Sequence, residues 1–197
     1  MSTGAAIART KLFESASNVF KDVITGERAR TEQELSALLA LYHNWGRIEW
    51  DKVHLQRVER AGVTEELSAS MIGIRGLTAL CEYPLFCAPG TLEMSRQGQF
   101  RADVLFLGRS VGPLVYVEAK IDKPIRADLI SGALQYLETQ NRFSPASFVI
   151  LRPRENINPK WYIGDLVEVL KNLNMKLEKT TPYVMYWEDV FKSCVDG

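Results

Sequence analysis

Residues 100–120 read FRADVLFLGRSVGPLVYVEAK and carry most of the information about the architecture. Two runs rich in Val, Leu, Phe and Tyr lie on either side of segment 108–113, which contains Gly and Pro. Such a pattern is typical of two strands joined by a turn. If the turn is symmetric, Leu107 pairs with Leu114 across the hairpin. The stretch therefore predicts an antiparallel β-hairpin with a defined register.

This register groups three charged residues on one face of the hairpin. Asp103 lies directly across from Glu118, and Lys120 shares that face because side chains alternate along a strand. Opposed residues have Cβ atoms about 4.5–5.5 Å apart, so the two carboxylates repel each other unless a cation lies between them. Hard oxygen ligands suit Mg²⁺ or Mn²⁺. The opposite face carries four apolar residues that would anchor the hairpin in a core, namely Val104, Phe106, Val115 and Val117.

The segments that flank the hairpin predict an α/β protein with one central sheet. The predicted strands outside the hairpin are 77–86, 147–153 and 182–187. The predicted helices after the hairpin are 127–143 and 165–174, with a closing helical turn at 188–194.

The N-terminal part of the chain shows helical patterns. An apolar stripe runs through residues 5–25, and a capping box begins a second helix near Thr31. Residues 47–62 are expected to continue that helix or to form a third one. Thr64 is expected to cap a short helix over residues 65–74.

Composition limits the class of protein. The 197 residues carry a formal net charge of zero, with 46% hydrophobic and 24% charged residues, which is typical of a globular protein. Zero net charge argues against a surface that is basic throughout. The sequence has no apolar run of about eighteen residues and no secretory signal, so we expect a cytoplasmic protein without membrane spans. Three cysteines without metal-ligand spacing predict reduced thiols.

The hairpin segment resembles the core motif of the PD-(D/E)xK nuclease superfamily. In that motif an acid on one strand faces an acid-x-lysine triplet on the next strand. Asp103, Glu118 and Lys120 match it, and Ala102 stands where the name-giving proline would be.

The resemblance implies a restriction-endonuclease-like fold, which is a central mixed sheet flanked by helices and built on an αβββαβ core. It covers about residues 64–152. We therefore expect an N-terminal helical extension, 1–63, that packs on a nuclease-like core, 64–197.

The resemblance also implies a division of roles within the site. Asp103, Glu118 and the backbone carbonyl of Ala119 would hold Mg²⁺ or Mn²⁺, which polarises the scissile phosphate. Lys120 would orient or deprotonate the attacking water and stabilise the transition state. Gln135, on the helix after the motif, resembles a glutamine that contacts phosphate or the water at the metal.

Many members of the superfamily take a further acid from the helix before the first strand. Glu66 is the favoured candidate for this metal ligand. Three other acids stay open, namely Glu59, Glu65 and Glu82. For each glutamate at a helix start, stabilisation of the helix dipole is at least as good an explanation as a ligand role.

Basic residues surround the motif in the sequence and are candidates for binding backbone phosphates. The first choices are Arg101, Lys123 and Arg126, with Arg109, Arg152 and Arg154 nearby. Asp122 and Asp128 lie among them, so a solvated charged rim is an equal alternative.

These observations predict a divalent-metal-dependent nuclease whose favoured substrate is DNA, with RNA second. Whether the protein forms a homodimer is left open. One alternative is a non-cleaving module that binds nucleic acid or protein. Another is a cap-snatching-like RNA endonuclease, in which His43 joins the metal ligands. For both His43 and His54, a structural or surface role is the simpler interpretation.

Overall fold

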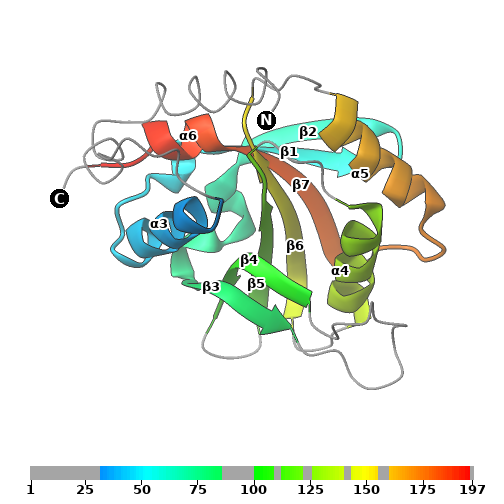
Figure 1. The fold of residues 1–197 in the computed structure, drawn as a ribbon, viewed down its shortest axis with the longest axis horizontal. Coiled ribbons are helices and arrows are strands. Elements are labelled where there is room, and N and C mark those ends of the chain that lie inside the picture. The colour runs from blue at the N-terminus through cyan, green and yellow to red at the C-terminus, as the bar shows by residue number, and fades with distance from the viewer. Residues whose placement is uncertain are drawn as a thin grey trace.

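The computed structural model describes residues 32–85, 100–108, 112–121, 126–139, 143–154 and 160–195. The protein is an α/β structure in which helices flank one seven-stranded mixed sheet (Figure 1). The strands are β1 (His54–Glu59), β2 (Gly62–Ser68), β3 (Thr78–Leu85), β4 (Phe100–Leu107), β5 (Gly112–Ala119), β6 (Phe143–Arg152) and β7 (Thr180–Tyr186). The helices are α3 (Glu32–Asn44), α4 (Ala127–Thr139), α5 (Lys160–Asn172) and α6 (Trp187–Lys192), with short 3₁₀ turns at Trp50–Lys52, Ala69–Ile72 and Ile74–Gly76. The helix predicted over residues 5–25 lies outside the described residues, as does Thr31. The helix predicted to begin near Thr31 is present as α3.

The sheet order is β2-β1-β7-β6-β5-β4-β3. The central pairs β5–β6 and β6–β7 are parallel, while the remaining pairs are antiparallel. Parallel neighbours need crossover connections, and α4 and α5 provide them. As a result, the C-terminal ends of β5, β6 and β7 meet at one edge of the sheet, at the top of Figure 1.

Each face of the sheet is covered by a separate apolar core. Helices α3 and α6 lie on one side and α4 and α5 on the other (Figure 1). The α3 side contains the four hairpin residues predicted to be buried, so that prediction is confirmed; they are Val104, Phe106, Val115 and Val117. The α4 side contains Leu105 and Tyr116, the apolar neighbours of the charged residues.

The predicted hairpin register is confirmed. Leu107 pairs with Leu114, and the ladder continues to Val104 and Val117. The predicted strands and helices after residue 77 are also present, each within a few residues of its expected bounds.

The helices predicted over residues 47–62 and 65–74 are wrong. These segments form the β1–β2 hairpin and 3₁₀ turns instead. The register shifts between Arg57 and Val58. Leu55 and Val58 are buried in the cores on opposite faces of the sheet, so burial of β1 on both faces produces a three-residue spacing that imitates a helix. Because β1 pairs with β7, the sheet takes strands from both sides of the expected boundary at residue 63.

Two smaller expectations concern the described part of the chain. No helix there is long and apolar enough to cross a bilayer. Cys81 and Cys194 are free thiols, as predicted. Cys87 lies outside the described residues.

Candidate functional site

The hairpin opens where its charged residues begin. The β4–β5 ladder stops at Val104 and Val117, one step before Asp103 and Glu118 would pair. There the backbone N–H of Ala119 donates to Oδ2 of Asp103 at 2.6 Å. A side-chain carboxylate thus replaces a main-chain acceptor, and the two strands separate around it.

The ammonium group of Lys120 lies at the centre of four oxygen atoms. Its Nζ is 2.8 Å from Oε1 of Glu32, 3.0 Å from Oε1 of Glu118 and 2.8 Å from the carbonyl oxygen of Ala119. Oδ2 of Asp103 is 3.7 Å away. These four oxygens come from α3, β4 and β5, and they converge on one cationic position at the edge of the sheet.

The backbone at Lys120 is held on both sides. Its N–H donates to the carbonyl of Leu151 on β6 at 2.8 Å, which extends the parallel ladder past the end of β5. Its carbonyl accepts from the indole Nε1 of Trp187 at 3.2 Å. Trp187 is fully buried and stacks on Phe191. The site therefore rests on the rigid centre of the fold and on α6.

Burial governs the protonation of the two predicted acids. Burial and, after it, the charge of Glu118 raise the pKa of Asp103 to about 7, against the opposing effects of Lys120 and the Ala119 N–H. Burial likewise raises the pKa of Glu118, although Lys120 opposes this. Both acids thus gain protons more readily than exposed carboxyls do.

Lys120 and Tyr116 stay protonated. Burial lowers the pKa of Lys120, but Glu118, Asp103 and Glu32 outweigh it and hold the pKa above its ordinary value. Burial raises the pKa of Tyr116, and the neighbouring Glu118 adds to the rise. The Tyr116 hydroxyl lies 3.4 Å from Oε2 of Glu118, while Lys120 approaches Oε1. The two oxygens of Glu118 therefore face different partners.

The donor set fits a hard divalent cation in its chemistry. Three carboxylates and one carbonyl are the oxygen ligands that Mg²⁺ and Mn²⁺ prefer. Within the described residues, however, no three His, Cys, Asp or Glu side chains are grouped closely enough to hold a metal ion. In this arrangement the Lys120 ammonium supplies the positive charge between the acids. A divalent ion would require that ammonium to move aside.

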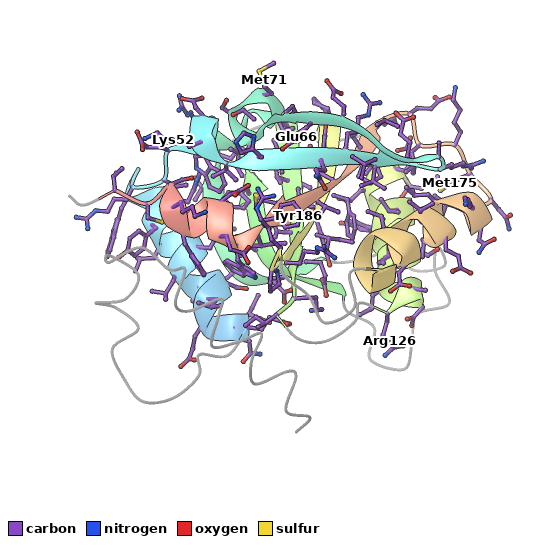
Figure 2. All side chains as sticks on the ribbon, turned by 90° about the horizontal axis from the view of Figure 1, so that it is seen from above. Lys52, Glu66, Met71, Arg126, Met175 and Tyr186 are labelled. Atoms are coloured by element: carbon purple, nitrogen blue, oxygen red, sulfur yellow. The ribbon has the colours of Figure 1, made fainter. Side chains whose placement is uncertain are left out.

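The structure brings together Asp103, Glu118, Ala119 and Lys120 but not every predicted site residue. Glu66 lies on edge strand β2 (Figure 2), and three strands separate it from β5. Its Oε1 lies 3.7 Å from Nδ1 of His54. The prediction that Glu66 is a ligand in this cluster is therefore wrong. Its segment forms a strand at the far edge of the sheet instead of the helix that precedes the hairpin.

The remaining predicted residues are not placed in the cluster. Gln135 lies on α4 and its amide donates to Ser131 on the same helix. Arg126 is exposed, pairs with Asp128, and lies at the periphery of the molecule when the sheet is viewed from above (Figure 2). The side chain of Arg101 and the whole of Lys123 lie outside the described part of the chain.

His43 is a core residue of the α3 face. Trp50 Nε1 donates to its Nδ1 at 3.0 Å, and its Nε2 lies 2.8 Å from the carbonyl of Leu77. Because Nδ1 accepts and Nε2 donates, the ring is neutral, and burial lowers its pKa in agreement. Both nitrogens already have partners, so the structural interpretation of His43 fits its surroundings and a ligand role does not.

Glu32 is the member of the cluster that the sequence interpretation missed. It lies in the first turn of α3 and reaches Lys120 across 88 residues of sequence. The signal was present, because an acid-rich helix start at Glu32 and Glu34 precedes the sheet. The incorrect helix predictions over residues 47–62 and 65–74 hide this signal, because they make a later segment the helix before the first strand.

Glu82 lies beside Asp103 on the neighbouring strand. Cys81 pairs with Val104 and Tyr83 with Ala102, so Glu82 falls opposite Asp103 in the register. Its φ of 49° is a left-handed conformation that a glutamate seldom adopts. Backbone strain of this kind gathers near functional sites. Glu82 is therefore a further acid, in addition to Glu32, Asp103 and Glu118, whose backbone lies beside the cluster.

Comparisons of the chain with family models, with curated proteins and with solved structures find no match.

Proposed function

We propose that this protein hydrolyses phosphodiester bonds of nucleic acid with the help of Mg²⁺ or Mn²⁺. One observation supports the proposal above all others. Four oxygens from Glu32, Asp103, Glu118 and Ala119 converge on the cationic group of Lys120 at the end of a rigid hairpin. Buried acids that crowd one position are costly to a fold unless they bind a cation, so they indicate function.

The order of elements supports a restriction-endonuclease-like fold. Elements α3, β3, β4, β5, α4 and β6 follow the αβββαβ sequence, and the β1–β2 hairpin is inserted between α3 and β3. The proposed core thus begins at Glu32 and includes the helix that supplies the additional acid.

In the proposed mechanism, Glu32, Asp103, Glu118 and the Ala119 carbonyl would hold the ion. The ion would supply Lewis-acid polarisation of the scissile phosphate. In the metal-free protein the three carboxylates hold the Lys120 pKa above its ordinary value. With those carboxylates on the ion, the Lys120 ammonium would orient the attacking water and stabilise the negative charge that develops on the phosphate oxygens. Trp187 and Leu151 fix the backbone from which Lys120 extends.

The test is cleavage of plasmid, linear duplex DNA, single-stranded DNA and RNA with Mg²⁺ or Mn²⁺. Lys120→Ala and excess EDTA should each abolish cutting, whereas Lys176→Ala, which removes an exposed lysine, should leave it intact. Because the resemblance favours DNA, duplex DNA is the first substrate to test. Cutting that persists in Lys120→Ala would show that another protein or another site is responsible.

One observation favours a second candidate function, a nucleic-acid-binding module that does not cut. The ammonium of Lys120 already balances part of the charge of Glu32, Asp103 and Glu118. A cluster satisfied in this way can persist without metal. Calorimetric titration with Mn²⁺ separates the two functions, since the absence of binding by folded protein would favour the module.

A further inference from the structure

A buried arginine lies next to the acidic cluster on the adjacent strand. Ala119 pairs with Leu151, so the next residues, Lys120 and Arg152, are neighbours across the ends of β5 and β6. Parallel neighbours lie about 4.8 Å apart. Glu118 pairs with Ile150, and alternation places Arg152 on the same face of the sheet as Ile150 and Glu118. Arg152 is only 3% exposed.

The ring of Tyr186 supports this guanidinium group from the side of β7. Arg152 and Tyr186 are paired residues, and the Arg152 Cζ lies 5.5 Å from the ring centroid. The Tyr186 hydroxyl donates to Oε1 of Gln56 on β1 at 2.7 Å, which fixes the ring. Tyr186 is near the centre of the sheet edge when it is viewed from above (Figure 2). Cluster, arginine and tyrosine thus form one continuous row across three parallel strands.

Arg154 also lies over the Tyr186 ring, but its polar contacts are made to α6. The Arg154 Cζ lies 4.3 Å from the Tyr186 centroid, but its Nη2 donates to Oδ1 of Asp189 at 2.7 Å. Its backbone N–H donates to both oxygens of Glu188 at 3.0 Å. Arg154 therefore anchors α6 to the end of β6, and Asp189 balances its charge.

The charges of the row match a phosphodiester once a divalent cation is present. With Glu32, Asp103 and Glu118 all ionised, as binding of a divalent cation would require, their charges and those of Lys120 and the adjacent Arg152 sum to one net negative charge. A divalent cation would convert this to one net positive charge. A phosphodiester carries one negative charge, so the occupied row would be neutral. A buried guanidinium is also the group best suited to a phosphate, because its planar donors form paired hydrogen bonds.

We propose that Arg152 binds a non-bridging oxygen of a nucleic-acid phosphodiester, in a subsite beside the acidic cluster. The inference rests on the proposed nuclease function for the identity of the ligand. It adds a substrate-binding residue that lies two strands away from β4 and outside the hairpin motif.

The experiment measures binding of fluorescein-labelled oligodeoxynucleotides, each with one linkage replaced by an uncharged methylphosphonate. Binding is measured at fixed salt with Ca²⁺ and, separately, with EDTA. Arg152→Gln should weaken binding of the unmodified oligonucleotide by about 10- to 100-fold. A methylphosphonate at one particular linkage should weaken binding to the wild-type protein by a similar factor. The same substitution should not weaken binding to the Arg152→Gln variant any further. Such non-additivity identifies a direct contact.

Two further variants keep the test decisive. Arg152→Lys retains the charge without the planar fork, and it should restore part of the affinity even where Arg152→Gln lowers the melting temperature. Arg154→Gln is the matched control on the same ring, and its methylphosphonate profile should remain that of the wild type. If both Arg152 variants fold and bind every oligonucleotide as the wild type does, the inference is wrong even in a protein that cuts. If the linkage effect appears without any cutting, the subsite stands and the nuclease proposal fails.

Discussion

At the scale of single residues, Asp103 couples stability to pH. Burial raises its pKa to about 7 in the folded protein, against about 3.9 in an unfolded chain. Between these values the folded state holds a proton that the unfolded state has lost. The contribution of Asp103 to the free energy of unfolding therefore falls as the pH rises from about 4 to about 7. Asparagine resembles the protonated acid and does not titrate.

Asp103→Asn should consequently gain stability relative to the wild type as the pH rises, in metal-free protein with EDTA present. Each pKa unit corresponds to about 1.4 kcal/mol, so the relative gain by about pH 8 is at most about 4 kcal/mol. Urea unfolding across that range measures it. Asp51→Asn, at an exposed aspartate whose pKa is lowered, is the control and should show no such gain. A difference between Asp103→Asn and wild type that stays constant with pH would contradict the prediction.

Glu32 provides the second prediction at this scale. If Glu32 is a metal ligand, Glu32→Gln should weaken Mn²⁺ binding by at least about tenfold, because removing a charged oxygen ligand lowers affinity for a hard cation. Glu66→Gln is the matched control, since the sequence favoured Glu66 and the structure places it on the far edge strand. Calorimetry with Mn²⁺ measures both variants. Unchanged affinity in Glu32→Gln would limit Glu32 to its ion pair with Lys120.

The residues of the site differ in how far the sequence could reveal them. Asp103, Glu118 and Lys120 follow from one hairpin, because the turn and the alternation of side chains determine which residues share a face. The acids at the start of α3 are visible in the sequence, but the contact of Glu32 with Lys120 depends on how α3 packs against the sheet. Arg152 was one of several basic residues in the sequence, and only the pairing of β5 with β6 places it beside Lys120.

At the scale of elements, the helix expected from near Thr31 is confirmed as α3, and the β1–β2 hairpin shows why periodicity failed over residues 47–74. Its strand β2 is an edge strand whose residues are mostly exposed, so no alternation of buried and exposed positions marks it. Charged residues on such an edge discourage pairing with other chains, and Glu65 and Glu66 also favour helices. The β4–β5 hairpin is buried on both faces and shows strong strand formers, so its pattern was reliable.

The packing of α3 gives a prediction at the same scale. His43 joins α3 to Trp50 and Leu77 through both ring nitrogens, and its ring meets Phe106 edge-on at 4.7 Å. His43→Ala should lower the free energy of unfolding by about 2–4 kcal/mol, since it leaves a cavity and an unpaired indole N–H. Mn²⁺ affinity of the folded variant should not change.

His54 is the natural control for His43 because it is the only other histidine and its side chain is 52% exposed. His54→Ala should alter the free energy of unfolding by no more than about 0.5 kcal/mol. Chemical denaturation and Mn²⁺ calorimetry on both variants separate a core role from a ligand role. Loss of Mn²⁺ affinity in folded His43→Ala would revive the cap-snatching-like alternative.

At the scale of the whole molecule, the sheet unites parts of the chain that the sequence pattern assigned to separate regions. Strand β1 lies between β2 and β7, and α3 supplies Leu35 and Leu39 to the core on its face of the sheet. A fragment 64–197 would lack both β1 and α3. Strand β2 would lose β1, its one neighbour among the described strands, and β7 would expose an unpaired edge and part of its apolar face.

We therefore expect fragment 64–197 to lose cooperative unfolding, although it retains Asp103, Glu118 and Lys120. The loss of buried α3 side chains alone removes several kcal/mol, at about 2–5 kcal/mol for each large apolar residue, against a total stability of about 5–15 kcal/mol. Thermal unfolding followed by near- and far-ultraviolet circular dichroism, with the full chain in parallel, measures this. A fragment with a sharp transition and a native near-ultraviolet spectrum would show that residues 64–197 form an independent core. We expect no such transition, because β1, which pairs with the edge of β7 in the full chain, precedes residue 64 and is missing from the fragment.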